Sequence, residues 1–503
     1  MTARTLFMLA LAVAAPPAVG AETVPLPGSP ALRPQAPPVP QPPPAAGTEP
    51  TGTQASAPLT LTLTQAVEHA LDQNPTVQRA RETITEFNLQ VRQVRADALP
   101  QLDLTVSAQS FRDPGLRNSP AFGDLPDFLP PEALGAYSFN RFGYDFRLEQ
   151  PVYTFGRIGG ALDAAREQLS AVKEEVRSVQ SVIARDVAIA YYDLLLARER
   201  LAVLDAERIS RERQLEQVKD RLALEDATRL DVLNSEVALA NLRPQILGAQ
   251  NGVAVSQARL NEILSRPIDA PLELLDGLRL PDPLPAIPDY RVLLDQASRT
   301  RPELLAFRYG RRVLEAGQKV TRADTLPEIS VAGNIGVNSY DVSNLGELSY
   351  RNWNVGVFLK WKLFDGFRTS SAVARLQSQV VQNRLEETAF RNALAREVER
   401  SSGEWWRGLQ AIEVAELASE QAAEARRLAE ESFQWGAASV LEILEAERQV
   451  QQAGLSKAES YYVALVALAD VKFLVGLRPD APLDVVPAAV APGPAAPTEE
   501  QQP

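Results

Sequence analysis

Two long proline-free stretches constrain the fold of this chain more than any other feature of its sequence. The first runs from Gly156 to about Leu222, and the second runs from Phe367 to Trp435. From Ile158 to Leu204, apolar residues recur at alternating steps of three and four, with one extra step of four before Val187, which is typical of a coiled-coil seam. At a rise of 1.5 Å per residue, each stretch predicts a helix roughly 100 Å long.

Shorter helices are predicted beside these two. They run about Thr64–Ala98, Thr228–Ser265, Asp289–Thr325 and Ser439–Val475. Two of them placed end to end cover roughly 110 Å. We therefore expect one long helix to lie beside a stacked pair of shorter helices, twice in each chain.

Four segments alternate between apolar and polar residues, which predicts strands with one apolar face. They are Gln101–Phe111, Arg141–Tyr153, Glu328–Tyr340 and Tyr350–Leu363. In the last segment the apolar positions are Val355, Val357, Leu359 and Trp361. Such a sheet could cover a soluble core. The strand lengths and the aromatic residues at the strand ends favour a transmembrane β-barrel instead, with those four residues facing lipid.

Four strands cannot close a barrel by themselves, because the smallest transmembrane barrels have eight strands. An open sheet in lipid would leave the hydrogen-bonding groups of its edges unsatisfied. Oligomerisation is therefore required. The residues alone leave a dimer and a trimer equally open.

The body of the chain contains two matching halves. Asn74-Pro75 corresponds to Arg301-Pro302, 227 positions later, and Leu230–Leu233 corresponds to Leu441–Leu444, 211 positions later. The change of offset places an insertion between Phe111 and Arg141 in the first half. We therefore predict an internal duplication, in which each half contains a strand pair, a long helix and shorter helices.

Composition argues against several classes of function. The net charge is −13 and the pI is about 5.0, whereas a nucleic-acid-binding protein presents a basic face. One His and no Cys leave little room for a metal site. The sequence contains no Walker motif and no Gly-x-Ser-x-Gly motif. We therefore predict no enzyme activity, no metal or other cofactor, and no nucleic-acid partner.

The ends of the sequence predict export and disorder. Residues 1–21 carry Arg4, a short apolar run and small residues before Glu22, which is typical of a signal peptide. The Pro-rich residues 22–59 predict a disordered linker. The remaining divisions are repeat 1 (60–265), an equatorial connector (266–288), repeat 2 (289–477), and an equatorial segment with a Pro-rich tail (478–503).

Together these features resemble the TolC family of outer-membrane channels, the exit ducts of drug-efflux pumps and type I secretion systems. The resemblance covers about residues 60 to 480. Besides the duplication, it rests on the run Leu61–Val67 before Asn74-Pro75, on Pro151–Arg157, and on tip motifs at Leu230–Leu233 and Gly436–Glu447.

The resemblance implies a homotrimer in the cell outer membrane. Its twelve-stranded barrel would lie in lipid, and a coiled-coil tunnel of α-helices would continue the barrel into the periplasm. An inner-membrane RND or ABC transporter would feed this duct with drugs or unfolded proteins through a periplasmic adaptor protein. The alternative is a periplasmic coiled-coil adaptor or structural subunit without a pore.

Both long helices are expected to reverse at the tunnel tip. Gly436 is placed to allow one reversal. Ser439 with Glu442, and Thr228 with Asp231, fit the capping-box pattern at the start of the next helix.

The resemblance further implies that Glu442 and Glu445 form a ring of carboxylates at the gate of the tip. The chain departs from well-known family members at two tip positions. Ala438 and Phe433 stand where an arginine and a tyrosine can hold the tip closed.

Overall fold

The structure is a computed structural model that describes residues 59–113, 137–285 and 287–483. The predicted signal peptide and the Pro-rich linker up to residue 58 lie outside the described residues. So do residues 114–136, which make up most of the predicted insertion, and the tail beyond residue 483.

Both proline-free stretches form single helices. α4 spans Arg157–Ala223 and α8 spans Arg368–Gln434, and each contains 67 residues. Val176, Val187 and Leu194 of the predicted apolar seam are buried on α4. This confirms that the seam is the packed face of the helix. Among the described residues, none of the helices combines the length and apolar character needed to cross a membrane.

Two of the shorter helices are broken, so their prediction as continuous helices is wrong. They form α1 (Leu63–Gln73) with α2 (Pro75–Ala96), and α6 (Tyr290–Thr300) with α7 (Pro302–Ala323). Proline disfavours helical backbone in the residue before it. Asn74 and Arg301 accordingly adopt ψ angles of 124° and 122°, which end α1 and α6.

The other two shorter helices form as predicted. α5 spans Arg229–Ile263 and α9 spans Val440–Leu474. The side chain of Asn74, before α2, donates to the carbonyl of Ile263 at 2.8 Å, and that of Arg301, before α7, donates to the carbonyl of Phe473 at 2.9 Å. The stacked pairs are therefore α5 with α2 and α9 with α7, while α1 and α6 lie outside them.

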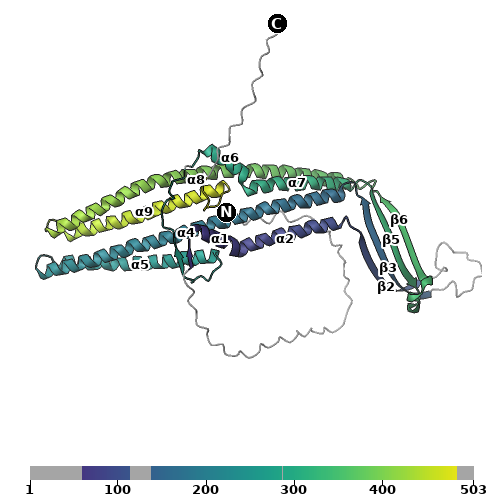
Figure 1. Cartoon of the computed structure of the whole chain (residues 1–503), viewed down its shortest axis with the longest axis horizontal. Coiled ribbons are helices and arrows are strands. Elements are labelled where there is room, and N and C mark those ends of the chain that lie inside the picture. Colours follow the sequence, from purple (N-terminus) through teal and green to yellow (C-terminus); the bar gives the residue numbers. More distant parts are fainter. Residues whose placement is uncertain (1–58, 114–136, 286, 484–503) are drawn as a thin grey trace, which may run out of the picture. The chain divides into compact units, whose positions relative to one another are not determined.

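The helices pack in a consistent lateral order (Figure 1). α4 contacts α2 and α5 on one side and α7 and α9 on the other, and α8 contacts α7 and α9. Within the described part of the chain, α8 therefore forms one edge of the helical layer. The stacked helices α2 and α5 form the other edge.

The four predicted strands form one antiparallel sheet in the order β2-β3-β5-β6. The strands are β2 (Gln101–Asp113), β3 (Tyr137–Tyr153), β5 (Glu328–Ser339) and β6 (Arg351–Lys360). β6 is shorter than predicted at both ends. Tyr350 belongs to a 3-10 turn, and the partner strand begins at Glu328, opposite Lys360.

Two apolar cores lie where α1 and α6 pack on the long helices. One joins α1 to α4 and α5 around Tyr191 and Leu260, and the other joins α6 to α8 and α9 around Leu293 and Trp405. These cores hold the middle of the helical layer together.

A short parallel strand pair, which the sequence analysis missed, adds to the first core. β1 (Leu59–Leu61) pairs with β4 (Leu272–Leu274). β1 thus begins at Leu59, which we had assigned to the linker. The buried Tyr191 hydroxyl donates to the carbonyl of Leu61 at 3.1 Å and so ties the strand pair to α4.

Candidate functional site

The apolar residues of the four strands line up across the sheet. Leu104 pairs with Phe146, Phe146 with Ile335, and Ile335 with Trp353. These four side chains are between 41% and 73% exposed. The strand register therefore gathers them into one broad apolar face, and such faces mark contact with lipid or another protein.

Three of the four residues predicted to face lipid lie on this apolar face. Val355, Val357 and Leu359 are 68%, 72% and 62% exposed. Trp361 is an exception, because it lies beyond the end of β6, and its assignment to the strand is wrong. Its indole nitrogen donates to the carbonyl of Thr325, just past α7, at 3.0 Å, so it joins the end of the sheet to the helical layer.

The opposite face of the sheet is polar. Asp145, Arg147 and Asn354 are among its residues, and a hollow of about 1120 Å³ lies along it. The alternation seen in the sequence thus becomes two open faces of opposite polarity. This is the arrangement required of a wall between lipid and water.

At the other end of the long helices, the turn after α8 reverses the chain. Gly436 has a φ of +70°, and the N–H of Ala437 donates to the carbonyl of Ser432 at 2.8 Å. This Schellman motif satisfies carbonyls that the helix end would leave unpaired. Gly436 follows the final cap residue, Trp435, so the reversal occurs where we predicted it.

The turn after α4 has the same backbone. Glu225 has a φ of +68°, and the N–H of Asp226 donates to the carbonyl of Arg221 at 2.8 Å. Thr228 and Asp231 then form the predicted capping box of α5. The hydrogen bonds donated by Thr228 lower the pKa of the Asp231 carboxyl below its ordinary value.

Glu442 and Glu445 lie on the first turns of α9 and are both exposed. The Glu442 carboxylate accepts a hydrogen bond from the backbone N–H of Ser439 at 3.2 Å, which completes the second capping box. Glu445 is paired with Arg448 at 2.7 Å. Hydrogen bonds from Arg448 and Gln449 lower the pKa of Glu445 to about 2, so it stays ionised beside a compensating charge.

The sequence analysis missed a contact between the two turns. The Arg221 guanidinium donates to the carbonyl of Phe433 at 2.8 Å and lies 4.4 Å from the centre of the Phe433 ring. Phe433 also belongs to an apolar cluster with Val218, Val232 and Ile443. The only sequence signal was a basic residue near the end of α4. The contact holds the α8 end against α4.

Comparison with known proteins gives several similar sequences. The outer membrane protein OprJ of Pseudomonas aeruginosa is 27% identical over 331 residues, which cover 63% of this chain and 64% of OprJ, a little under two thirds of its length. The alkaline protease secretion protein AprF of the same species is 23% identical and covers 68% of this chain and 71% of its own. The cation efflux system protein CusC of Escherichia coli O6:H1 is 25% identical, and the match covers 76% of this chain and 79% of CusC.

Solved structures share the fold. The crystal structure of CusC matches 82% of this chain and 92% of its own, with a TM-score of 0.69 and 19% identity. That of the Campylobacter jejuni CmeC outer membrane channel matches 83% and 87%, with a TM-score of 0.69 and 16% identity. The family model described as outer membrane efflux protein matches residues 66–266 and 293–477, which make up more than half of the chain. The chain therefore belongs to the outer membrane efflux protein family, whose members are outer-membrane channels rather than enzymes, as the sequence resemblance predicted.

Proposed function

We propose that three copies of this chain form one continuous duct, with a twelve-stranded barrel in the outer membrane and a helical tunnel in the periplasm. The observation that carries this proposal is the pair of open edges in the described chain. β2 and β6 are the free edges of the sheet, and α8 and the stacked helices α2 and α5 are the free edges of the helical layer.

The free edges of the helical layer carry exposed apolar side chains. On α8 they include Val381, Leu385, Trp406, Val414 and Leu417, and on α5 they include Leu233, Val237, Leu247 and Val255. Pairing the α8 edge of one copy with the stacked α2 and α5 edge of the next would bury both rows. The same rotation would pair β6 with β2 and satisfy the edge hydrogen-bonding groups that lipid cannot satisfy.

The paired element lengths support an origin by internal duplication. α4 and α8 each have 67 residues, and α5 and α9 each have 35. A trimer of duplicated halves would have six similar units around its axis. In this proposal residues 60–265 and 289–477 are the two repeats, and the segments around residues 266–288 and 478–483 form a belt between them.

The duct would serve as the exit of a tripartite export system, fed through a periplasmic adaptor from an inner-membrane RND or ABC transporter. The names of its relatives support this role. They include a cation efflux protein and a protease secretion protein. The same scaffold therefore serves both small and polypeptide cargo among relatives, and we propose the duct without choosing between them.

In this trimer, Glu442 and Glu445 would place six carboxylates at the periplasmic mouth. A ring of like charges in a narrow entrance attracts cations. Because Arg448 compensates Glu445 within the chain, Glu442 would supply the larger share of the uncompensated charge. We therefore infer a cation-selective entrance that multivalent cations block from the tip side.

Single-channel recording of the purified protein in planar bilayers tests the duct and the ring together. Discrete conductance steps are expected, because a closed trimer holds a water-filled path. Cation selectivity is expected to fall in a Glu442→Ala, Glu445→Ala double variant and to rise in Arg448→Ala. Recordings without channels would contradict the duct, whereas channels with unchanged selectivity in both variants would contradict the ring alone.

A further inference from the structure

Three ionisable side chains meet inside the junction between α4 and α9. Arg211 on α4 pairs with Glu207, one turn away on the same helix, and its Nε lies 3.7 Å from Oε2 of Glu447 on α9. The Ser210 hydroxyl donates to Oε1 of Glu447 at 2.9 Å. The side chains of Glu207, Arg211 and Glu447 are 4%, 11% and 3% exposed. We call Glu207, Ser210, Arg211 and Glu447 the buried clip.

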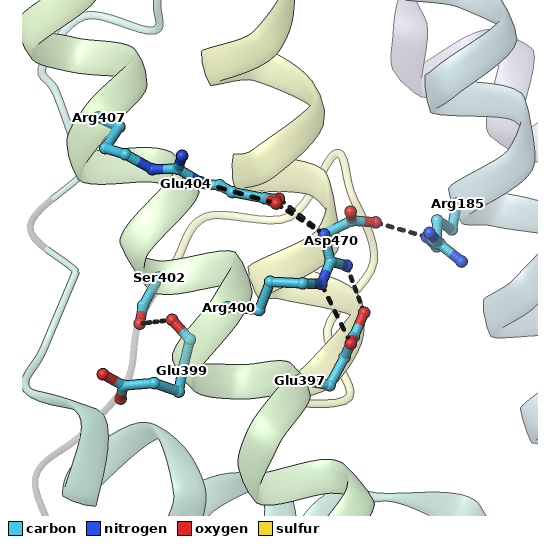
Figure 2. Close-up of polar contacts among 8 residues, drawn as sticks. All are labelled: Arg185, Glu397, Glu399, Arg400, Ser402, Glu404, Arg407 and Asp470. Carbon is cyan, nitrogen blue, oxygen red and sulfur yellow. Dashed lines mark hydrogen bonds and ion pairs between the residues drawn. The ribbon is translucent and has the colours of Figure 1, made fainter.

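Other polar contacts between α4 and α9 are more exposed. Figure 2 shows Arg185 on α4 reaching Asp470 on α9, where the side chains are 31% and 10% exposed. Farther along, Arg200 lies 3.8 Å from Glu459, with side chains 46% and 62% exposed. Among these ion pairs the buried clip is nearest the tip, two turns along α4 from Val218 of the apolar tip cluster.

The charges within the buried clip do not balance. Two carboxylates share one guanidinium, and Oε2 of Glu207 and Oε2 of Glu447 accept no hydrogen bond. Burial raises the pKa of both carboxyl groups. The groups around Glu447 are Ser210, Arg211, Arg213 and Glu207 from α4, and Glu430 with its ion-pair partner Arg426 from α8. Protonation of one carboxyl would therefore relieve an uncompensated buried charge.

A cavity of about 320 Å³ lies beside Glu447 and between α4, α8 and α9. Gln214 lines it, is 5% exposed, and has no hydrogen-bond partner at either amide atom. Buried polar groups in native proteins nearly always find partners, and this polar cavity is large enough to admit water. This part of the junction can therefore hydrate when the helices move apart.

We propose that Glu447 is a positioning residue of the gate, and that the buried clip sets how closely the α8–α9 hairpin lies against α4. This inference rests on the proposed duct and tip. When one carboxyl of the clip is protonated, the hairpin lies close to α4 and the tip is narrow. When both carboxylates are ionised, the excess charge draws water into the junction and favours a wider tip.

The sign of the pH effect follows from the direction of the pKa shifts. A carboxyl whose pKa is raised in the closed arrangement binds its proton more tightly there than when it is hydrated. Acid therefore favours the closed arrangement. This advantage is complete below the ordinary carboxyl pKa and is lost as the pH rises through the raised value.

Recordings of the full-length protein at pH 7 and pH 5 on the tip side test the proposal. The wild-type current is expected to fall on acidification. Glu447→Gln, which mimics the protonated group, is expected to give a low current at both pH values. The open-to-closed ratio changes by up to about tenfold for each unit by which the pKa is raised. Glu459→Gln is the matched control on the same helix and is expected to behave as wild type.

Two results would overturn the buried clip. One is a wild-type pH response that survives in Glu447→Gln, and the other is an equal loss of that response in Glu459→Gln. Repeating the measurement in the Glu442→Ala, Glu445→Ala background removes the exposed carboxylates of the tip as a source of the response. A thermal melt of Glu447→Gln beside the wild-type protein at pH 5 and pH 7 checks that the variant is folded.

A crosslinking assay reads the junction without any channel activity. The chain has no Cys, and a Cβ added at Gly454 on α9 would lie 3.3 Å from Cγ1 of Val203 on α4. A Val203→Cys, Gly454→Cys pair is expected to form a disulfide, and faster at pH 7 when Glu447→Gln is also present. Equal crosslinking rates with and without Glu447→Gln would overturn the proposed role of the buried clip. Faster crosslinking in a protein that gives no channel conductance would contradict only the proposed duct.

Discussion

The turns that end α4 and α8 have the same backbone but different side chains. Both place a residue at a φ near +70°, namely Glu225 at +68° and Gly436 at +70°, and both lead into a capping box. The first turn carries the charged residues Glu225 and Asp226, whereas the second carries Gly436 and Ala437. The hydrogen bonds of the helix ends therefore determine the path of the chain. The residue types determine its strain and charge.

Removing the contact that joins the two turns is expected to have the largest effect. Arg221→Ala loses a charged hydrogen bond to the Phe433 carbonyl and the stacking on its ring. Together these are expected to stabilise the closed tip by about 2 kcal/mol. Single-channel recording should show a larger resting current.

Arg229→Ala is the control for this variant, because Arg229 is exposed and begins α5 in the same turn. If both variants keep the wild-type resting current, the contact between the turns does not hold the tip closed.

Exchanging the residues at the left-handed positions should change stability in opposite directions. Gly436→Ala is expected to cost about 1 kcal/mol, because a side chain with a Cβ disfavours this backbone. The nearest atom to an added Cβ is 3.9 Å away, so the cost is conformational and not steric. Glu225→Gly is expected to stabilise by a similar amount, measured as a higher thermal midpoint. Changes of the same sign would show that the two turns are not equivalent.

Removing the two caps should have nearly equal effects. Thr228→Ala and Ser439→Ala each lose the side-chain oxygen that accepts from the third residue of the following helix. Each substitution is expected to lower the free energy of unfolding by about 1 kcal/mol. Thermal unfolding monitored by circular dichroism measures this change. A much larger loss for Ser439→Ala would indicate that the second turn has an additional role.

The smallest expected effect is a pH dependence at the first turn. The pKa of Asp231 is lowered by its hydrogen bonds with Thr228, so its contribution is present above the ordinary aspartate pKa and is lost as the pH falls through the lowered value. The Asp231→Asn variant is therefore expected to lose less stability than the wild-type protein when the pH is lowered from neutral to acid, as measured by thermal melts at each pH. Asp226→Asn, in the same turn but outside the capping box, should leave the acid dependence unchanged.

Local patterns predicted much of the fold and part of the site. The 3–4 spacing predicted α4, the alternation of apolar residues predicted the four strands, and the capping patterns predicted the starts of α5 and α9. The breaks at Asn74 and Arg301 were missed although Pro75 and Pro302 were visible, because a proline inside a helix can kink the helix without ending it. The strand end at Trp361 was missed because alternation continues beyond the last residue that has a partner.

The sequence by itself determined where the long helices run and which strand face is apolar, because both are periodic properties of neighbouring residues. Only the tertiary structure decided which distant residues meet. Arg221 and Phe433, and likewise Arg211 and Glu447, are more than 200 positions apart in the sequence. They meet because α4 packs beside α9 at one particular register and touches the end of α8 at the tip. In the sequence, Glu447 is one of many acidic residues on a charged helix. Burial at that junction raises the pKa of its carboxyl group.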